Sequence, residues 1–363
     1  MDNTMANEPK DSGVSFAQFF DRCKLPTSVK DDCDAFARSK YSEPVRSAPF
    51  QGYCSYTVFV GEEKVIQFRP LAHKLDVRIT DAACKVFGPL APETDDLGEL
   101  EGTGLYVFSM RKIPGVSLAD LRADTDPLQA RSQREQVVRD FARIQAMSWA
   151  HAKSKESVQK KRLVGSSLRW RLEVMADKLP PRFRGIAKSI LRDLPEIEDL
   201  PWTLSHGDFL PSNIMVCPKS GKILGLLDWA EAEFLPFGIG MYGLQELLGE
   251  DRDGHFVYYP EVKHLRDLFW TELLSRLPDL SRDNRRVALV RKAQILGILL
   301  WHGIAFDNGK LDRAVEEGKD DGEIERLDAF LLHRTRLKSQ KPSTFHLLGT
   351  PWTFIYGFLF GKS

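Results

Sequence analysis

Four polar residues in one short segment carry most of the chemistry that this sequence offers. His206, Asp208, Asn213 and Asp228 lie within residues 203–229, TLSHGDFLPSNIMVCPKSGKILGLLDW, among apolar residues typical of a core. Two carboxylates and one amide oxygen around a common space form a hard oxygen site, which suits Mg²⁺ better than a softer transition metal. Phosphoryl transfer needs such a set: Asp228 and Asn213 would hold Mg²⁺ on nucleotide phosphates, while Asp208 would orient a hydroxyl and accept its proton.

A hairpin is predicted to bring these groups together. Residues 214–216 form one short strand, residues 223–227 form its partner, and residues 218–221 supply the turn. Because a short hairpin returns the end of its second strand to the start of its first, we expect Asn213 and Asp228 to lie side by side. In the alternative interpretation the polar residues only cap turns, as single Asp and Asn residues often do. Four of them at these offsets favour the catalytic interpretation.

The same segment resembles the catalytic and metal-binding loops of the aminoglycoside phosphotransferase and choline kinase group, relatives of the protein kinases. Protein kinases carry H-R-D, four residues, N, and later D-F-G. This chain carries HGD at 206–208, four residues, Asn213, and DWA at 228–230. Gly in place of Arg is similar to the small-molecule branch. The run GLLDWAEAEFLPFG, with PWTLSHGD before it, is most similar to fungal members of the group.

The resemblance covers residues 45–310 and implies a two-lobed, protein-kinase-like fold of the α+β class, with a small antiparallel-sheet N-lobe and a larger, mostly helical C-lobe. It also implies an enzyme that transfers the γ-phosphoryl group of ATP or GTP, with Mg²⁺, to a hydroxyl of a small molecule. In this group the His that corresponds to His206 is mainly structural and holds the loop, since it cannot easily reach the same proton as the base.

Four segments are expected along the chain. Residues 1–44 form an N-terminal extension that begins disordered and becomes helical, and residues 45–112 form the N-lobe. Residues 113–345 form the C-lobe with the catalytic loops and the acceptor pocket. The apolar tail at 346–363 is expected to dock on the C-lobe, because it is too short and too broken by Gly and Pro to span a membrane.

The resemblance places the residues that bind the nucleotide in the N-lobe. Gly52 and the hydroxyl of Ser55 lie where a nucleotide-covering loop is expected, just before two strands that turn at residues 61–63. The strand VIQFR lacks the usual phosphate-binding Lys and offers Gln67 and Arg69, which share one face because strand side chains alternate. Arg69 carries the charge and is the preferred phosphate contact. The alternative for Arg69 is a solvated position on an edge strand.

Three further nucleotide positions follow from the resemblance alone. Asp76 begins a predicted helix that ends at Val86 and corresponds to the acid that pairs with the phosphate-binding base. Its alternative role is to favour the helix dipole. The backbone of Met110 and Arg111, at the end of an apolar strand, is placed where it would hydrogen-bond the edge of a purine.

An acidic segment follows Trp229, where the resemblance places the acceptor pocket. One of Glu231 and Glu233 is expected near the site, where an acidic rim would attract a cationic acceptor such as an amino sugar. Glu246 and Glu250, on a predicted helix, are expected to be solvated surface carboxylates. The oligomeric state stays open.

The amino-acid composition limits the kinds of binding partner and the cellular compartment that we expect. The 51 basic and 51 acidic residues balance, which gives no support to a nucleic-acid partner. The five cysteines are scattered without metal-type spacing, which indicates a reducing compartment without disulfides. The polar N-terminus lacks an apolar signal core, so a cytoplasmic protein is expected.

Two other functions remain as alternatives. One is a non-catalytic binding module that kept the fold, suggested by Gln67 and the single glycine of the covering loop; the intact Asp208, Asn213 and Asp228 argue against it. The other is a protein kinase, which the missing Arg after His206 and the absence of an A-P-E segment argue against.

Overall fold

The computed structural model describes residues 16–48, 51–52, 54–124, 127–158, 161–252, 254–305 and 311–333. The predicted disorder at 1–13 and the predicted docking of the tail at 346–363 lie outside these residues. The described residues form two units: a first unit with the chain up to Leu75 and Thr94–Lys112, and a second unit with Asp76–Glu93 and the chain from Ile113 onwards.

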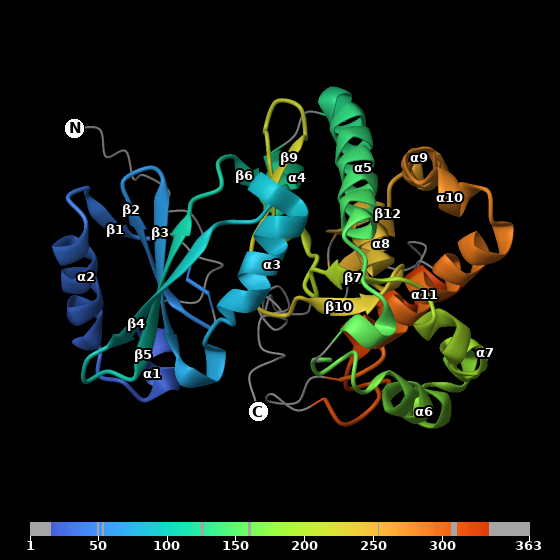
Figure 1. The fold of residues 1–363 in the computed structure, drawn as a ribbon, viewed down its shortest axis with the longest axis horizontal. Helices are drawn as coiled ribbons and strands as arrows, with labels where there is room; N and C mark the ends of the chain where they lie inside the picture. Colours follow the sequence, from blue (N-terminus) through green and yellow to red (C-terminus); the bar gives the residue numbers. More distant parts are fainter. Residues whose placement is uncertain are drawn as a thin grey trace, which may run out of the picture. The chain divides into compact units, whose positions relative to one another are not determined.

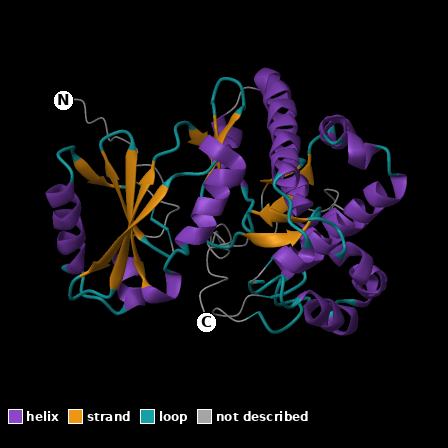
Figure 2. Ribbon diagram, viewed as in Figure 1, coloured by secondary structure: helices purple, strands orange, loops and turns teal. Residues whose placement is uncertain are grey.

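An antiparallel sheet forms the centre of the first unit (Figures 1 and 2). Its strands, in the spatial order β1-β2-β3-β5-β4, are β1 Val45–Ser47, β2 Tyr56–Val60, β3 Lys64–Pro70, β5 Leu105–Arg111 and β4 Thr94–Leu100. The three strands predicted around residues 56–70 and 105–110 are confirmed. The strand β4 was not predicted, because its sequence TDDLGEL is polar and no residue of it is fully buried.

Two helices cover one face of this sheet. They are α1 Phe16–Cys23 and α2 Val29–Lys40, with Pro26 in the segment between them, so the helical part expected before residue 45 consists of two helices. Phe20 and Cys33 are fully buried and form one hydrophobic cluster with Ile66 and Phe68 of β3. Alternation along β3 turns Gln67 and Arg69 to the opposite face.

The second unit is mostly helical (Figure 2). Its helices are α3 Val77–Phe87, α4 Leu118–Asp124, α5 Pro127–Ala150, α6 Leu168–Lys178, α7 Pro181–Glu198, α8 Gly243–Leu247, α9 Val262–Arg276, α10 Pro278–Ser281, α11 Asn284–His302 and α12 Asp321–Leu332. The expected N-lobe at 45–112 included α3, but Ala83, Val86 and Phe87 of this helix pack in the core of the second unit.

Three small antiparallel sheets complete the second unit. They are β6 Val116–Ser117 with β8 Ile214–Val216 and β9 Ile223–Leu226; β7 Trp202–Ser205 with β10 Glu233–Pro236; and β11 Gly249–Arg252 with β12 His255–Tyr258. The sequence predicted the hairpin β8–β9 but not the other pairs. The helix that we expect to include Glu250 ends at Leu247, and β11 begins at Gly249.

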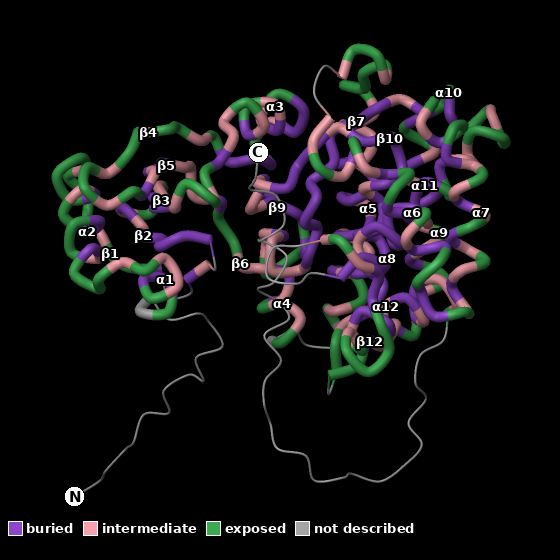
Figure 3. The backbone as a smooth tube through the Cα atoms, turned by 90° about the horizontal axis from the view of Figure 1, so that it is seen from below, coloured by how far each residue is buried: buried purple, intermediate pink, exposed green. Residues whose placement is uncertain are grey.

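The helix α5 supports the segment that carries the polar residues. Val137, Val138, Phe141 and Ile144 recur at helical spacing and are buried. The ring of Phe141 packs against that of Phe209, with centroids 4.4 Å apart. In the second unit, coloured by burial in Figure 3, every residue of α8 is buried, whereas α5 mixes buried with more exposed residues. Along the described stretches of chain, no helix has the length and apolar character needed to cross a bilayer.

Candidate active site

The hairpin β8–β9 brings Asn213 and Asp228 to one end. The strands pair Ile214 with Leu226, and the N–H of Leu227 donates to the carbonyl of Asn213 over 2.8 Å. From α5, the buried carboxylate of Asp140 accepts the N–H of Ile223 at 3.0 Å, so the hairpin is fixed to the core helix. These local hydrogen bonds therefore bring Asn213 and Asp228 close together, as the sequence predicted.

The turn before the hairpin holds Asp208 by several hydrogen bonds. One oxygen of its carboxylate, Oδ2, accepts from the side-chain amide of Asn213 at 2.7 Å, and the same amide donates to the carbonyl of Asp208 at 3.0 Å. The N–H of the next residue, Phe209, donates to the hydroxyl of Tyr242 at 2.7 Å. Asp208 is 3% exposed, so its position is fixed by contacts within the protein.

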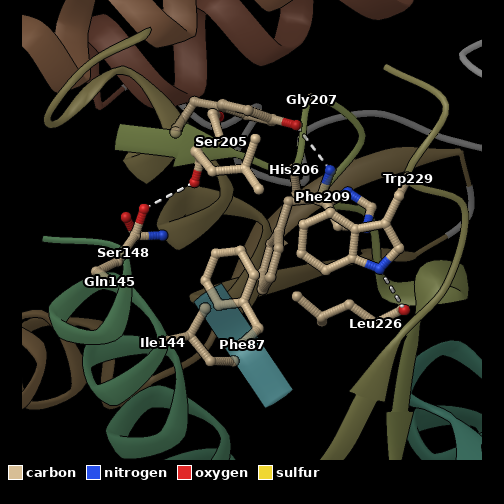
Figure 4. Close-up of a pocket in the computed structure, with 13 residues that line it drawn as sticks. Phe87, Ile144, Gln145, Ser148, Ser205, His206, Gly207, Phe209, Leu226 and Trp229 are labelled. Carbon is tan, nitrogen blue, oxygen red and sulfur yellow. Dashed lines mark hydrogen bonds between the residues drawn. The ribbon is translucent and has the colours of Figure 1, made fainter. Parts of the chain in front are cut away.

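His206 supports this turn and stays neutral. Its Nδ1 accepts the N–H of Asp208 at 3.3 Å, and its ring packs on Trp229 with centroids 4.5 Å apart (Figure 4). Burial lowers the pKa of His206 to about 4, although the nearby Asp228 carboxylate favours the protonated ring. A small pocket beside the ring is lined by apolar side chains such as Phe87 and Ile144 and by polar ones such as Gln145 and Ser148. With Nδ1 occupied by a backbone donor, His206 fits the loop-holding role better than that of a base.

Three carboxylates converge in front of this turn. One oxygen from each of Asp208, Asp228 and Glu231 lies within 4.8 Å of the other two. Burial, then the charge of Asp228, raises the pKa of Asp208 well above its usual range, and the hydrogen bond from Asn213 opposes this shift. Within the part of the chain that the structure describes, Oδ1 of Asp208 has no hydrogen-bond partner.

These residues fit a magnesium ion. A buried carboxylate oxygen without a partner is costly unless a cation or a donor meets it. Carboxylate and amide oxygens are the protein ligands that Mg²⁺ uses. The Nδ2 group of Asn213 is committed to Asp208, so its amide oxygen is the atom that remains for the ion, beside the carboxylate of Asp228.

The two glutamates proposed for the acceptor pocket have different environments. Glu231 is 3% exposed and joins the carboxylate cluster. The carboxylate of Glu233 accepts the N–H groups of Val164 at 2.9 Å and Gly165 at 3.0 Å, away from that cluster. Strand alternation would place both side chains on one face, but β10 begins only at Glu233, so the rule does not reach Glu231.

Arg162 is a residue that the sequence did not indicate. Its Nη1 donates to the carbonyl of Ala230 at 3.1 Å and to that of Ala232 at 2.6 Å, on both sides of Glu231. With the amides of Val164 and Gly165 on Glu233, it ties the loop before α6 to the segment after Asp228. The sequence offered only a basic loop at this position, so the contact could not be foreseen.

In the first unit, Arg69 is buried and preorganised. It is 4% exposed; its Nε donates to Oε1 of Gln67 at 2.9 Å and its Nη1 to the carbonyl of His73 at 3.4 Å. The alternative of a solvated Arg on an edge strand is therefore wrong, because β3 lies between β2 and β5. Met110 and Arg111 lie opposite residues 64–65 of the same strand and are half-buried.

The remaining nucleotide positions make local contacts. Ser55 is buried, with its hydroxyl 3.1 Å from that of Thr57; Gly52 is described, whereas residues 49, 50 and 53 lie outside the described chain. Asp76, in the second unit, caps α3 by accepting the N–H of Arg78 at 3.1 Å and also binds the guanidinium of Arg78. The structure thus shows the helix-terminus role for Asp76.

The prediction of solvated surface carboxylates was wrong for Glu246. This side chain is buried, accepts from Nε of Arg326 at 3.1 Å, and lies 3.8 Å from Nε2 of His302. Its partners come from α11 and α12, far along the chain. Glu250 is partly buried and accepts from the hydroxyl of Tyr259 at 2.9 Å.

Comparisons with solved structures find proteins of low sequence identity. An aminoglycoside-3'-phosphotransferase of type VIII is 16% identical, covers 75% of this chain and 100% of its own, and has a TM-score of 0.48. A structure described as the GDP and kanamycin complex of APH(2")-IIIa is 14% identical, with 75% and 89% covered and a TM-score of 0.49. A glucosamine kinase is 17% identical, with 76% and 77% covered and a TM-score of 0.44. Curated protein sequences gave no match.

One protein-family model matches this sequence. The model described as "Phosphotransferase enzyme family" matches residues 51–257, which include most of the antiparallel sheet and the candidate site. This match confirms the kinase-like fold and the enzyme class that the motifs predicted. Because it spans more than half of the 363 residues, the chain belongs to the phosphotransferase enzyme family.

Proposed function

We propose that this enzyme transfers the γ-phosphoryl group of ATP or GTP to a hydroxyl of a small molecule, with Mg²⁺. The observation that carries the proposal is the convergence of Asp208, Asn213 and Asp228 at one end of the hairpin, with one oxygen of Asp208 left without a partner among the described residues. Family membership supplies the reaction class, and the site supplies the residues for it.

Each residue has a separate task in this proposal. Asp228 and the amide oxygen of Asn213 would hold Mg²⁺, which when bound neutralises charge on the phosphoryl group. Asn213 fixes Oδ2 of Asp208, so Oδ1 is the atom that would accept the hydrogen bond of the acceptor hydroxyl and then its proton. Positioning is the main contribution of Asp208, since phosphoryl transfer passes through a loose transition state. His206 holds the turn.

The nucleotide contacts are proposed separately for each unit. In the first unit they are Gly52, Ser55, Gln67, Arg69 and the backbone of Met110 and Arg111; in the second unit, Asp76. Arg69 is the proposed phosphate contact, because Gln67 and the carbonyl of His73 already orient its guanidinium. One similar structure is titled a GDP complex and another an ADP-bound one, which supports a purine nucleotide and leaves both bases in the proposal.

The acceptor is proposed to be a hydroxylated amine. One similar structure is titled a kanamycin complex and another is a glucosamine kinase, and the buried carboxylates near Asp208 would attract a cation. Of the two candidate contacts, Glu231 remains, because Glu233 is engaged by backbone amides. A fungal-type sub-branch, the expected segment limits and a cytoplasmic location stay predictions from the sequence.

A turnover assay tests the proposal. The wild type is incubated with Mg²⁺, ATP or GTP, and a panel of hydroxylated amines, and phosphorylated product is measured. Asp208→Ala should lose at least about a hundredfold in kcat, since positioning and proton transfer are both removed. Asp279→Ala, which removes an exposed carboxylate on α10, is the matched control. Nucleotide binding without turnover on any acceptor would favour the non-catalytic binding module.

A further inference from the structure

Glu231 is a buried carboxylate that the proposed function offers as an acceptor contact, and its surroundings point to a different role. It follows Asp228 by three residues, is 3% exposed, and contributes one oxygen to the cluster with Asp208 and Asp228. Burial of a carboxylate is unfavourable unless hydrogen bonds or a cation compensate. Three carboxylates whose oxygens lie within 4.8 Å of one another add mutual repulsion to that cost.

The backbone around Glu231 is held from two sides. Arg162 binds the carbonyls of Ala230 and Ala232, the residues on either side of Glu231. On the other side, a Cβ atom at Gly207 would lie 2.6 Å from the carbonyl carbon of Glu231, so the two backbones are in close contact. These contacts hold the backbone of Glu231 in the position from which its carboxylate lies near the two aspartates.

A second observation points to a ligand at this place. Oδ1 of Asp208 is buried and has no hydrogen-bond partner among the residues that the structure describes. It belongs to a side chain whose other oxygen is fixed by Asn213. Before an acceptor hydroxyl binds Oδ1, a divalent cation in the cluster would compensate both the burial of this oxygen and the repulsion between the carboxylates, and hard oxygen donors suit Mg²⁺ or Mn²⁺.

We propose that Glu231 is a third carboxylate of the divalent-cation site, and that this carboxylate allows the site to bind Mg²⁺ or Mn²⁺ before any nucleotide arrives. Magnesium sites in phosphoryl-transfer enzymes commonly use one or two carboxylates and complete the coordination with substrate phosphates. A third carboxylate raises the negative charge of the site itself, so that phosphate oxygens are no longer required for retention of the ion. This inference rests on the proposed function only for the location of the metal.

Binding of Mn²⁺ to the nucleotide-free protein tests this proposal. The full chain, freed of metal, is titrated with Mn²⁺ and the free ion is measured by electron paramagnetic resonance. The wild type should bind one Mn²⁺, and Glu231→Gln should raise its Kd at least about tenfold. Glu173→Gln, at an exposed carboxylate on α6, should bind as the wild type does. Equal Mn²⁺ affinity in Glu231→Gln and the wild type would overturn the proposal.

Thermal unfolding separates a ligand from a structural residue. Glu231→Gln removes one of three neighbouring negative charges, so its melting temperature without cation should equal or exceed that of the wild type, while the rise on adding Mn²⁺ should shrink. A melting temperature clearly below the wild type without cation would assign Glu231 a structural role and contradict the proposal. Glu231→Asp, which keeps a carboxylate, should retain more of the Mn²⁺-induced rise than Glu231→Gln.

The wild-type turnover assay distinguishes failure of this inference from failure of the proposed function. If the wild type phosphorylates an acceptor while Glu231→Gln changes only the KM of that acceptor, Glu231 binds the acceptor and only this inference fails. If Mn²⁺ binding depends on Glu231 but no acceptor is phosphorylated, the cation site stands and the proposed reaction fails.

Discussion

Gly207 is in close backbone contact with Glu231: a Cβ at residue 207 would lie 2.6 Å from the carbonyl carbon of Glu231. The φ angle of Gly207 is +80°, which side-chain-bearing residues rarely adopt. The Arg that protein kinases carry at this point of the motif would therefore not fit. In this chain Arg162, from the loop before α6, binds the segment after Asp228 instead.

Gly207→Ala is expected to destabilise the protein by more than the backbone conformation alone explains. The left-handed φ costs Ala about 1–2 kcal/mol, and the contact with Glu231 should add about 1–3 kcal/mol. Urea unfolding measures both costs together. Gly254→Ala is the matched control, because Gly254 has a φ of +79° but no atom of the described residues within 4 Å of its Cβ position. Equal losses of stability in the two variants would show that the contact with Glu231 is not limiting.

Arg162→Ala is expected to weaken the binding of Mg²⁺ more than it lowers the free energy of unfolding. Without the guanidinium, the carbonyls of Ala230 and Ala232 lose their donor and the segment after Asp228 becomes mobile. The apparent affinity for Mg²⁺ in the turnover assay should fall about tenfold, as when a group that orients metal ligands is removed. Arg162→Lys, which offers a single ammonium, should recover part of it. Arg169→Ala, at an exposed guanidinium on α6, is the control; a wild-type Mg²⁺ dependence in Arg162→Ala would refute the positioning role.

The sequence predicted the features that depend on residues close to one another along the chain. Asp208, Asn213 and Asp228 could be placed together because a hairpin fixes their offsets, and Pro26 and the turn at 61–63 mark the ends of elements directly. Contacts between remote loops leave no periodic pattern, so Arg162 was missed. For the same reason Glu246 was predicted on the surface: its partner Arg326 lies 80 residues further along the chain.

Tyr242→Phe tests which contacts hold the turn of the base, the turn at residues 206–209 that carries Asp208. The hydroxyl of Tyr242 accepts the N–H of Phe209, and its ring stacks on Trp301 with centroids 4.4 Å apart. Phe preserves the stacking but leaves a buried N–H without its acceptor, which should cost about 1–3 kcal/mol of unfolding free energy. Because Phe209 follows Asp208 directly, kcat should fall with little change in the KM for nucleotide.

The matched control for this variant is Tyr259→Phe. Its hydroxyl donates to Glu250, outside the turn of the base. Both variants should lose stability in urea unfolding, but only Tyr242→Phe should lose kcat. A normal kcat in Tyr242→Phe would indicate that the turn keeps its geometry without this hydrogen bond.

The buried neutral His206 predicts a specific loss of stability in acid. Its pKa is about 4 in the folded protein and about 6.5 in the unfolded chain, so the unfolded chain binds more protons between these values. The stabilisation is therefore complete above about pH 6.5 and is lost as pH falls towards 4, by about 3 kcal/mol in total. Asp208, whose pKa is raised, acts in the opposite direction.

His206→Asn isolates this contribution, because an Asn oxygen can accept the N–H of Asp208 but does not titrate. The unfolding free energy in urea is measured from pH 4.5 to pH 7.5 in metal-free buffer. The advantage of the wild type over His206→Asn should grow as pH rises through this range, since only the wild type regains the His206 contribution. His151→Asn, at an exposed His just after α5, should keep the wild-type pH dependence. Parallel profiles for the wild type and His206→Asn would show that His206 is already protonated, or accessible to protons, in the folded protein.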